Sequence, residues 1–257
     1  MPQTDEKEDR KYRAPALEKG LDVLELLSKH GVPMTPSQMS VDLGRSVSEL
    51  FRMIQVLEFR GYIEQSSDGY RLTNRLFTLG MAQAPIKSLS EVALPAMREL
   101  AVATGQSCHL VVPSGDQIVV IGRIESPGDL GYSVRIGYRR NLIEATSGLL
   151  LYGCASPATK DYLRVRLADR HGAQKTGRFI KAAEAAGAEG HVERDSDFVK
   201  GVTDLVAPIM GADGIIATLI TPFIQRTPPT CDMDRCRALL QETARTISLE
   251  TGALTQA

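Results

Sequence analysis

The chain has 257 residues, 43% of them hydrophobic and 24% charged, with a net charge of −1. These values are typical of a soluble globular protein with room for two small domains, and they exclude nucleic-acid binding driven by overall charge. No apolar run approaches the roughly 18 residues of a membrane span. Residues 1–12 are too charged for a signal peptide and predict a disordered arm. We therefore expect a cytoplasmic protein without membrane contact.

The four cysteines carry no spacing typical of a metal site. None forms a C-x-x-C pair, and no histidine lies at a ligand offset from them. Reduced thiols in a cytosolic protein are the expected state. We predict no metal and no cofactor.

Two helices are predicted near the N-terminus. Residues 16–30, "ALEKGLDVLELLSKH", place leucines at helical spacing, and Gly31 follows as a stop. Thr35 then precedes "PSQMSVDLG" as an N-cap, with Gln38 at the spacing of a capping box. Gly44 is suited to end this second helix in a left-handed conformation.

A third helix and a hairpin follow at once. In "SVSELFRMIQVLEFRG" Ser46 and Glu49 again have capping-box spacing, and Gly61 ends the pattern. "YIEQSSDGYRL" indicates two short strands around a Ser-Asp-Gly turn. Three helices and a hairpin within residues 13–75 predict a winged helix-turn-helix domain.

The remaining chain predicts a linker helix and an α+β domain. A largely helical stretch follows, with breaks expected near Pro85 and Pro95, so that residues 76–90 form a linker helix and 91–254 a second domain. The strand-like runs are "CHLVVP", "QIVVIGRI", "YSVRIG", "DLVAPIM" and "GIIATLIT". Helices are expected around 146–154, 157–169, 178–187 and 231–251. Strand pairs joined by tight turns predict an antiparallel sheet with helical cover.

The order of these pieces resembles the IclR family of transcriptional regulators over nearly the whole chain. The matching segments are "ALEKGLDVLELL", "LGRSVSELFRMIQVLEFRGYIEQSSDGYRLTNRLFTLG", "MRELAVATGQSCHLVVPSGDQIVVIGRIESPG", "EATSGLLLYG" and "KGVTDLVAPIMGADGIIATLIT". The resemblance implies a DNA-binding domain, a linker helix and a GAF-like effector-binding domain. It also implies dimers or tetramers that respond to small metabolites, often organic acids.

The outward face of the third helix is the candidate reading surface. At about 100° per residue, Leu50, Ile54 and Leu57 share a buried face, which leaves Arg52 and Gln55 outward. These side chains suit guanine and adenine, and arginines in the turn and wing suit phosphates. The predicted contacts to a double-stranded operator are Arg45, Ser46, Ser48, Glu49, Arg52, Gln55 and Arg71.

Glu49 is the unexpected member of this set, because its negative charge would face phosphates. Its carboxylate can close the capping box by accepting from the Ser46 backbone N–H. It can also accept from cytosine N4 in the major groove. The spacing favours the cap as its main role and leaves the base contact open.

The resemblance also selects an effector site. "EATSG" at 144–148 matches a pocket-lining segment, in which Thr146 is expected to cap a helix whose free N–H groups favour an anion. Asp204, and Thr221 or its neighbour, match two further pocket positions. Arg135 is a candidate partner for a carboxylate. The predicted effector residues are Tyr132, Arg135, Thr146, Ser147, Gly148, Asp204 and Thr221.

No motif in the chain indicates catalysis. Nucleophile-elbow, phosphate-loop, dinucleotide and zinc-protease patterns are missing. The adjacent Cys108 and His109 would point to opposite faces of a strand, which makes them a poor catalytic dyad. We predict a ligand-responsive, homo-oligomeric transcriptional regulator of a catabolic operon, not an enzyme, with a small organic hydroxy acid as effector. The alternative is a GAF-like sensor or redox enzyme whose helix-turn-helix serves protein contacts.

Overall fold

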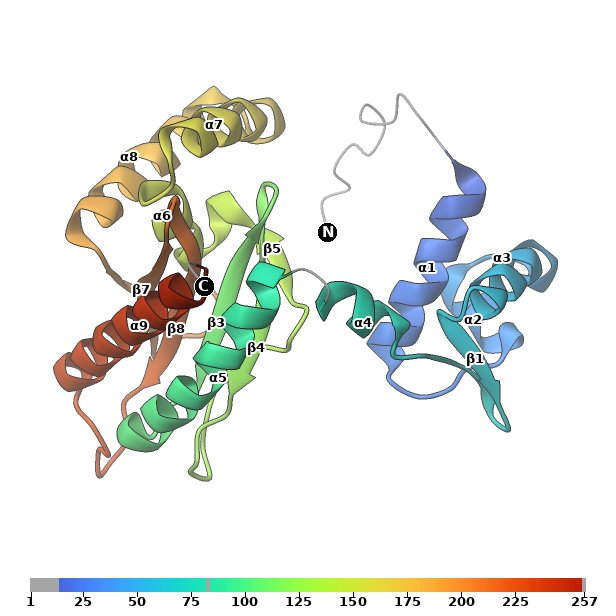
Figure 1. Ribbon diagram of the computed structural model, residues 1–257, viewed down its shortest axis with the longest axis horizontal. Helices are drawn as coiled ribbons and strands as arrows, with labels where there is room; N and C mark the ends of the chain where they lie inside the picture. The colour runs from blue at the N-terminus through green and yellow to red at the C-terminus, as the bar shows by residue number, and fades with distance from the viewer. Residues whose placement is uncertain (1–13, 82–83, 256–257) are drawn as a thin grey trace. The chain divides into compact units, whose positions relative to one another are not determined.

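The computed structural model describes residues 14–81 and 84–255 (Figure 1). The chain folds as two compact units that divide between Ala84 and Pro85. The arm expected at 1–12 lies outside the described residues. Among the helices described, none combines the length and apolar character needed to cross a membrane.

The N-terminal unit has the predicted winged helix-turn-helix order. Both capping boxes form, at Thr35 and at Ser46, and Gly31 and Gly44 adopt the left-handed conformation at the ends of their helices. The elements are α1 (Pro15–His30), α2 (Pro36–Leu43), α3 (Val47–Phe59), β1 (Ile63–Ser66), β2 (Gly69–Leu72) and α4 (Arg75–Met81).

The wing is fixed to the loop between α1 and α2. Met34 and Tyr70 exchange two backbone hydrogen bonds, of 2.9 and 2.8 Å. Gly69 has φ +129°, and a Cβ there would overlap the Met34 carbonyl, so the close approach requires glycine. Met34 and Tyr70 also join the small core of this unit, which is completed by Val23, Leu27, Met39, Leu50, Ile54 and Ile63.

The region expected as one linker helix over 76–90 contains α4 and the beginning of α5 (Ala84–Thr104). The expected domain boundary at residue 91 falls inside α5. The break predicted near Pro95 is wrong, because Pro95 lies within α5. It faces solvent while Ala93 and Met97 are buried. This burial keeps the helix in place although proline removes one backbone hydrogen bond.

The C-terminal unit is built on one six-stranded antiparallel sheet in the order β5-β4-β3-β8-β7-β6. Its strands are β3 (Cys108–Ser114), β4 (Gln117–Ile124), β5 (Arg139–Asn141), β6 (Val192–Asp195), β7 (Val202–Gly211) and β8 (Gly214–Ile224). The fold class predicted from the sequence is therefore confirmed.

One strand prediction is wrong, and the two edge strands β5 and β6 were not predicted. "YSVRIG" is irregular rather than a strand: Gly137 has φ +83°, and the Val134 N–H donates to a histidine ring instead of a neighbouring strand. The edge strand β5 lies just beyond it. The short edge strand β6 was not predicted, because three of its four residues are charged and carry no strand periodicity.

Helices cover both faces of the sheet (Figure 1). On one face α5 and α9 (Met233–Thr255) pack against one hydrophobic core. On the other face lie the 3₁₀ turn η1 (Leu142–Glu144), α6 (Thr146–Gly153), α7 (Pro157–His171) and α8 (Ala173–Glu189), with a second core. A Cβ at Gly153 would overlap the Ala183 carbonyl, so α6 and α8 approach at the distance of their backbones.

Candidate DNA interface and effector cavity

Helix α3 has the two faces predicted for a reading helix. Leu50 and Ile54 are buried in the core of the N-terminal unit. Ser48, Arg52 and Gln55 are exposed on the other side. Of these three, Ser48 and Arg52 lie in the N-terminal half of α3, which is the part that enters the major groove in helix-turn-helix proteins.

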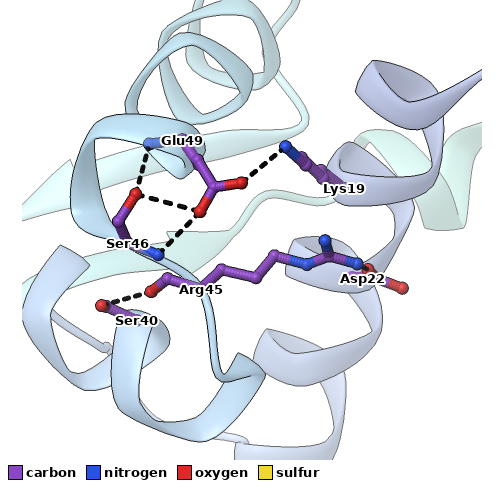
Figure 2. Close-up of polar contacts among 6 residues, drawn as sticks. All are labelled: Lys19, Asp22, Ser40, Arg45, Ser46 and Glu49. Carbon is purple, nitrogen blue, oxygen red and sulfur yellow. Dashed lines mark hydrogen bonds and ion pairs between the residues drawn. The ribbon is translucent and has the colours of Figure 1, made fainter.

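Glu49 is held from two directions (Figure 2). Its Oε2 accepts from the Ser46 backbone N–H at 3.0 Å, and the Glu49 N–H donates to Ser46 Oγ at 3.3 Å. Its Oε1 pairs with Lys19 Nζ of α1 at 3.0 Å. The Lys19 hydrogen bond, followed by those from Ser46, lowers the pKa of Glu49 from 4.5 to about 2. Both carboxylate oxygens are therefore used within the domain, which supports the capping interpretation.

Two other predicted contacts also have partners inside the unit. Arg45 Nη2 donates to Asp22 Oδ2 of α1 at 2.8 Å (Figure 2). The Arg45 carbonyl accepts from Ser40 Oγ of α2. Arg45 therefore joins the turn before α3 to both α1 and α2. Arg71 in the wing pairs with Glu64 across the hairpin at 2.6 Å. The Arg71–Glu64 pair is exposed and contributes little to stability, whereas the Arg45–Asp22 pair is partly buried. Each pair directs its arginine towards a carboxylate of the same unit.

Arg52 differs from these two arginines. Within the described ranges it forms no ion pair, and its neighbour Gln55 makes only a 3.4 Å contact with Glu58. Ser48 likewise has no side-chain partner among described residues. Ser48, Arg52 and Gln55 are therefore the side chains of α3 that remain available for base edges.

A cavity opens on the α6 face of the sheet. It has a free volume of about 60 Å³. Strands β3, β4 and β8 contribute an apolar wall, and the N-terminus of α6 and the irregular segment 125–138 close the other sides. The lining residues are His109, Val111, Ile118, Val120, Tyr132, Val134, Tyr138, Arg140, Ala145, Thr146, Ser147, Ser196, Phe198, Asp204, Ile220 and Pro222.

Four of the seven predicted effector residues meet at this cavity: Tyr132, Thr146, Ser147 and Asp204. Arg135 and Gly148 do not line it. A Cβ at Gly148 would overlap the Leu142 carbonyl oxygen, so a larger side chain there would disturb the fold rather than fill the cavity. Thr221 is also outside the lining, but its neighbours Ile220 and Pro222 belong to it, as expected for alternation along a strand.

Thr146 has a different role from the predicted helix cap. Ala145 is the N-cap of α6 and makes no side-chain hydrogen bond. Thr146 Oγ1 instead donates to Asp204 Oδ2 at 2.8 Å, which joins α6 to β7. Burial raises the pKa of the Asp204 carboxyl above its usual value. The first N–H groups of α6 have no acceptor within the helix, and the first two residues of this helix, Thr146 and Ser147, line the cavity.

Two basic side chains that line the cavity were not predicted as effector contacts. Arg140 lies in β5 with its guanidinium 4.0 Å from the centroid of the Phe198 ring. His109 is buried on β3, and the sequence predicted only that it is unsuited to catalysis. Its alternation with Val111, on the face opposite Cys108 and Leu110, was the available signal.

The cysteines lack the environment of reactive thiols. Burial raises the pKa of Cys108 and of Cys236 to about 12. It also raises the pKa values of Cys154 and Cys231. Because the thiolate is the reactive form, these sites disfavour the redox alternative.

Known proteins share both units. Residues 16–67 match the IclR helix-turn-helix domain, and residues 84–249 match the C-terminal domain of the bacterial transcriptional regulator IclR. The repressor AllR of Klebsiella pneumoniae is 27% identical over 95% of this chain and 92% of its own length. The regulator KdgR of Escherichia coli K12 is 28% identical over 84% of this chain and 85% of its own length.

Solved structures agree at the level of the fold. An IclR homolog from Microbacterium hydrocarbonoxydans, complexed with 4-hydroxybenzoate, has a TM-score of 0.74 at 20% identity and covers 93% of this chain and 99% of its own. A regulator from Alicyclobacillus acidocaldarius has a TM-score of 0.70 at 20% identity, and the match covers 94% of this chain and 100% of that regulator. The match with AllR of E. coli K12 is 29% identical but spans about half of either protein, 55% of this chain and 54% of AllR.

A winged helix-turn-helix unit followed by an α+β unit is the domain order of a bacterial transcriptional regulator of this type. The chain belongs to the IclR family of bacterial transcriptional regulators.

Glu49→Gln tests whether Glu49 serves mainly to cap α3 or to contact a base. A carboxylate with a lowered pKa adds stability that is present above its unfolded pKa, near 4.5, and is lost as the pH falls towards 2. We expect the variant to melt below the wild type at pH 6, and this difference to shrink between pH 4.5 and 2. Operator affinity should hold or rise, because a negative charge is removed near phosphates.

The control is Glu25→Gln, at an exposed α1 position with no ion pair among the described residues. Its melting difference should stay small across the same pH series. A selective loss of preference for one C·G pair in Glu49→Gln, with unchanged melting, would favour the base-contact interpretation.

Proposed function

We propose that this protein is a homo-oligomeric regulator that reads its operator with Ser48, Arg52 and Gln55 and responds to a small hydroxy-carboxylate. The cavity beside the α6 N-terminus carries this proposal, because it combines N–H donors, a cation and a carboxylate in one apolar enclosure. Genes for catabolism of the effector are the natural targets of such a regulator.

Pairing within the domain narrows the reading surface. Arg45, Glu49 and Arg71 are engaged by Asp22, Lys19 and Glu64. These pairs support roles in orienting α3 and the wing, with phosphate contacts made by their remaining donors. Arg52 keeps its whole guanidinium for the groove, where an arginine bonds bidentately to guanine O6 and N7.

The donors around the cavity favour an anion. The first-turn N–H groups at Thr146 and Ser147 carry the positive end of the helix dipole. Arg140 adds a full charge, and its stacking on Phe198 holds the guanidinium in place. Arg140 therefore takes the place that the sequence assigned to Arg135.

Asp204 selects among anions. One of its oxygens accepts from Thr146, which leaves the other for a ligand. A carboxylate repels a plain anion but accepts from a hydroxyl, so the site favours a molecule that bears both groups. The size of the cavity agrees: about 60 Å³ is well below the ~150 Å³ that holds benzene. A ligand of a few heavy atoms fits as the cavity stands, and a larger one requires segment 125–138 to move.

Arg52→Ala should weaken specific operator binding by about 1–3 kcal/mol and relax the preference at one base pair. The measurement is fluorescence anisotropy on the operator and on single-base variants at fixed salt. Arg178→Ala, an exposed change on α8 with the same loss of charge, should leave both quantities unchanged. Equal affinity and equal base preference in Arg52→Ala would remove this residue from the reading surface.

Helix α4 presents an apolar side for self-association. Leu76, Phe77 and Leu79 are 40%, 68% and 48% exposed. Since one winged domain reads too few base pairs for specificity, a dimer or tetramer on a pseudo-palindrome is expected. Light scattering at micromolar concentration should show at least a dimer, and Phe77→Glu should shift it towards monomer. Val165→Glu, at an exposed site on α7, should not. A monomeric wild type on operator DNA would contradict this.

Asp204→Asn tests the selection for a hydroxyl. The wild type should bind lactate better than propionate, and glycerate better than 3-hydroxypropionate, by calorimetry. Because a charge-assisted hydrogen bond becomes a neutral one, the variant should narrow this preference by about 1 kcal/mol. Asp213→Asn, in the exposed β7–β8 turn, is the control. A wild type that responds only to cations or neutral apolar molecules would refute the effector class.

A further inference from the structure

His109 is the most deeply buried titratable group at the cavity. It is the second residue of β3, and it is only 2% exposed. It lines the cavity beside the apolar strand residues. Any contact between His109 and a ligand rests on the proposed function of this cavity as an effector site.

The His109 ring holds the segment that closes the cavity. Val134 N–H donates to His109 Nε2 at 2.8 Å, and Ser133 Oγ lies 3.3 Å from the same nitrogen. In the described chain these are the only hydrogen bonds made by residues 129–134. Tyr132 and Val134 of this stretch line the cavity. The position of the cavity wall is thus tied to one imidazole.

The same contact assigns the proton of the ring. Because Nε2 accepts from a backbone N–H, it is unprotonated, and the neutral ring must carry its proton on Nδ1. Burial, and then the charge of Arg123, lower the pKa of His109 to about 4, so the ring is neutral at physiological pH. No acceptor for Nδ1–H is found among the described residues. A residue that lines the cavity therefore carries a donor that no described residue satisfies.

We propose that His109 couples the effector to the cavity wall: Nδ1–H donates to a ligand oxygen while Nε2 holds segment 129–134 through the Val134 amide. The ligand and the segment bind opposite nitrogens of one ring. A ligand that fixes the ring orders the segment, and a segment that is already held presents the donor in the right direction.

Variants of His109 separate the roles of its two ring nitrogens. In His109→Gln the side-chain amide oxygen can reach the position of Nε2 and accept from Val134, but no donor remains at Nδ1. In His109→Leu both functions are lost. Ser133→Ala removes only the weaker contact, and His191→Gln repeats the chemical change at a histidine outside the cavity.

Hydrogen exchange of the ligand-free, full-length protein tests the tie. His109→Leu should speed exchange in peptides covering 129–134 by about fivefold or more, the effect expected for one lost hydrogen bond. His109→Gln, Ser133→Ala and His191→Gln should exchange nearly as the wild type does. If exchange is unchanged in His109→Leu while the fold is intact elsewhere, His109 does not hold segment 129–134, whatever the cavity binds.

Calorimetry with lactate, glycerate and glycolate tests the donor. For the acid that binds the wild type best, His109→Gln should weaken binding about tenfold. That acid should protect 129–134 from exchange in the wild type and not in His109→Leu. Equal affinity in the wild type and His109→Gln refutes the Nδ1 contact. If no acid binds the wild type, the hydroxy-carboxylate proposal fails together with that contact, and the exchange experiment alone decides the tie.

Discussion

Burial of both faces of one sheet is the constraint on which the proposed effector site depends. Successive residues of β3 serve different surroundings: Cys108 and Leu110 pack under α5 and α9, whereas His109 and Val111 face the α6 side. Because successive side chains of a strand point to opposite faces of the sheet, this assignment of β3 residues to the two faces is fixed. The cavity can then form only where the α6 side is incompletely filled, which is at the first turn of α6. The close approach of α6 and α8 at Gly153 fills the other end of that layer.

In the DNA-binding unit the constraint is the placement of charge. Its net charge is small, so the position of each charge matters more than the total. Lys19 neutralises Glu49, and Asp22 engages Arg45, both through α1. The first helix, which carries no predicted base contact, thereby sets the charge and orientation of the reading helix. Arg52 remains the cation of α3 without such a partner in the described chain.

Local signals in the sequence were sufficient for most elements. The two capping boxes, the left-handed glycines and the amphipathic period of α3 act over a few residues, and each appears in the structure as predicted. The errors required knowledge of distant contacts. Pro95 continues a helix because the sheet supports its neighbours, and Thr146 bonds to Asp204, 58 positions away, rather than capping α6. Arg140 reaches the cavity through the pairing of β5 with β4, which no local pattern encodes.

For the proposed effector site, the β3 strand offers a physical connection between the cavity and helix α5. Cys108 Sγ donates to the Met97 carbonyl of α5 at 3.4 Å, and His109, the next residue, lines the cavity on the opposite face. Helix α5 begins at Ala84, shortly after α4 ends at Met81. A ligand that moves β3 therefore acts on the helix that follows the DNA-binding unit in the chain. It can shift the equilibrium only by the difference in its affinity for two conformations, typically about 1–3 kcal/mol. One or two hydrogen bonds at the cavity supply that amount, so a small ligand with few contacts is sufficient for the response.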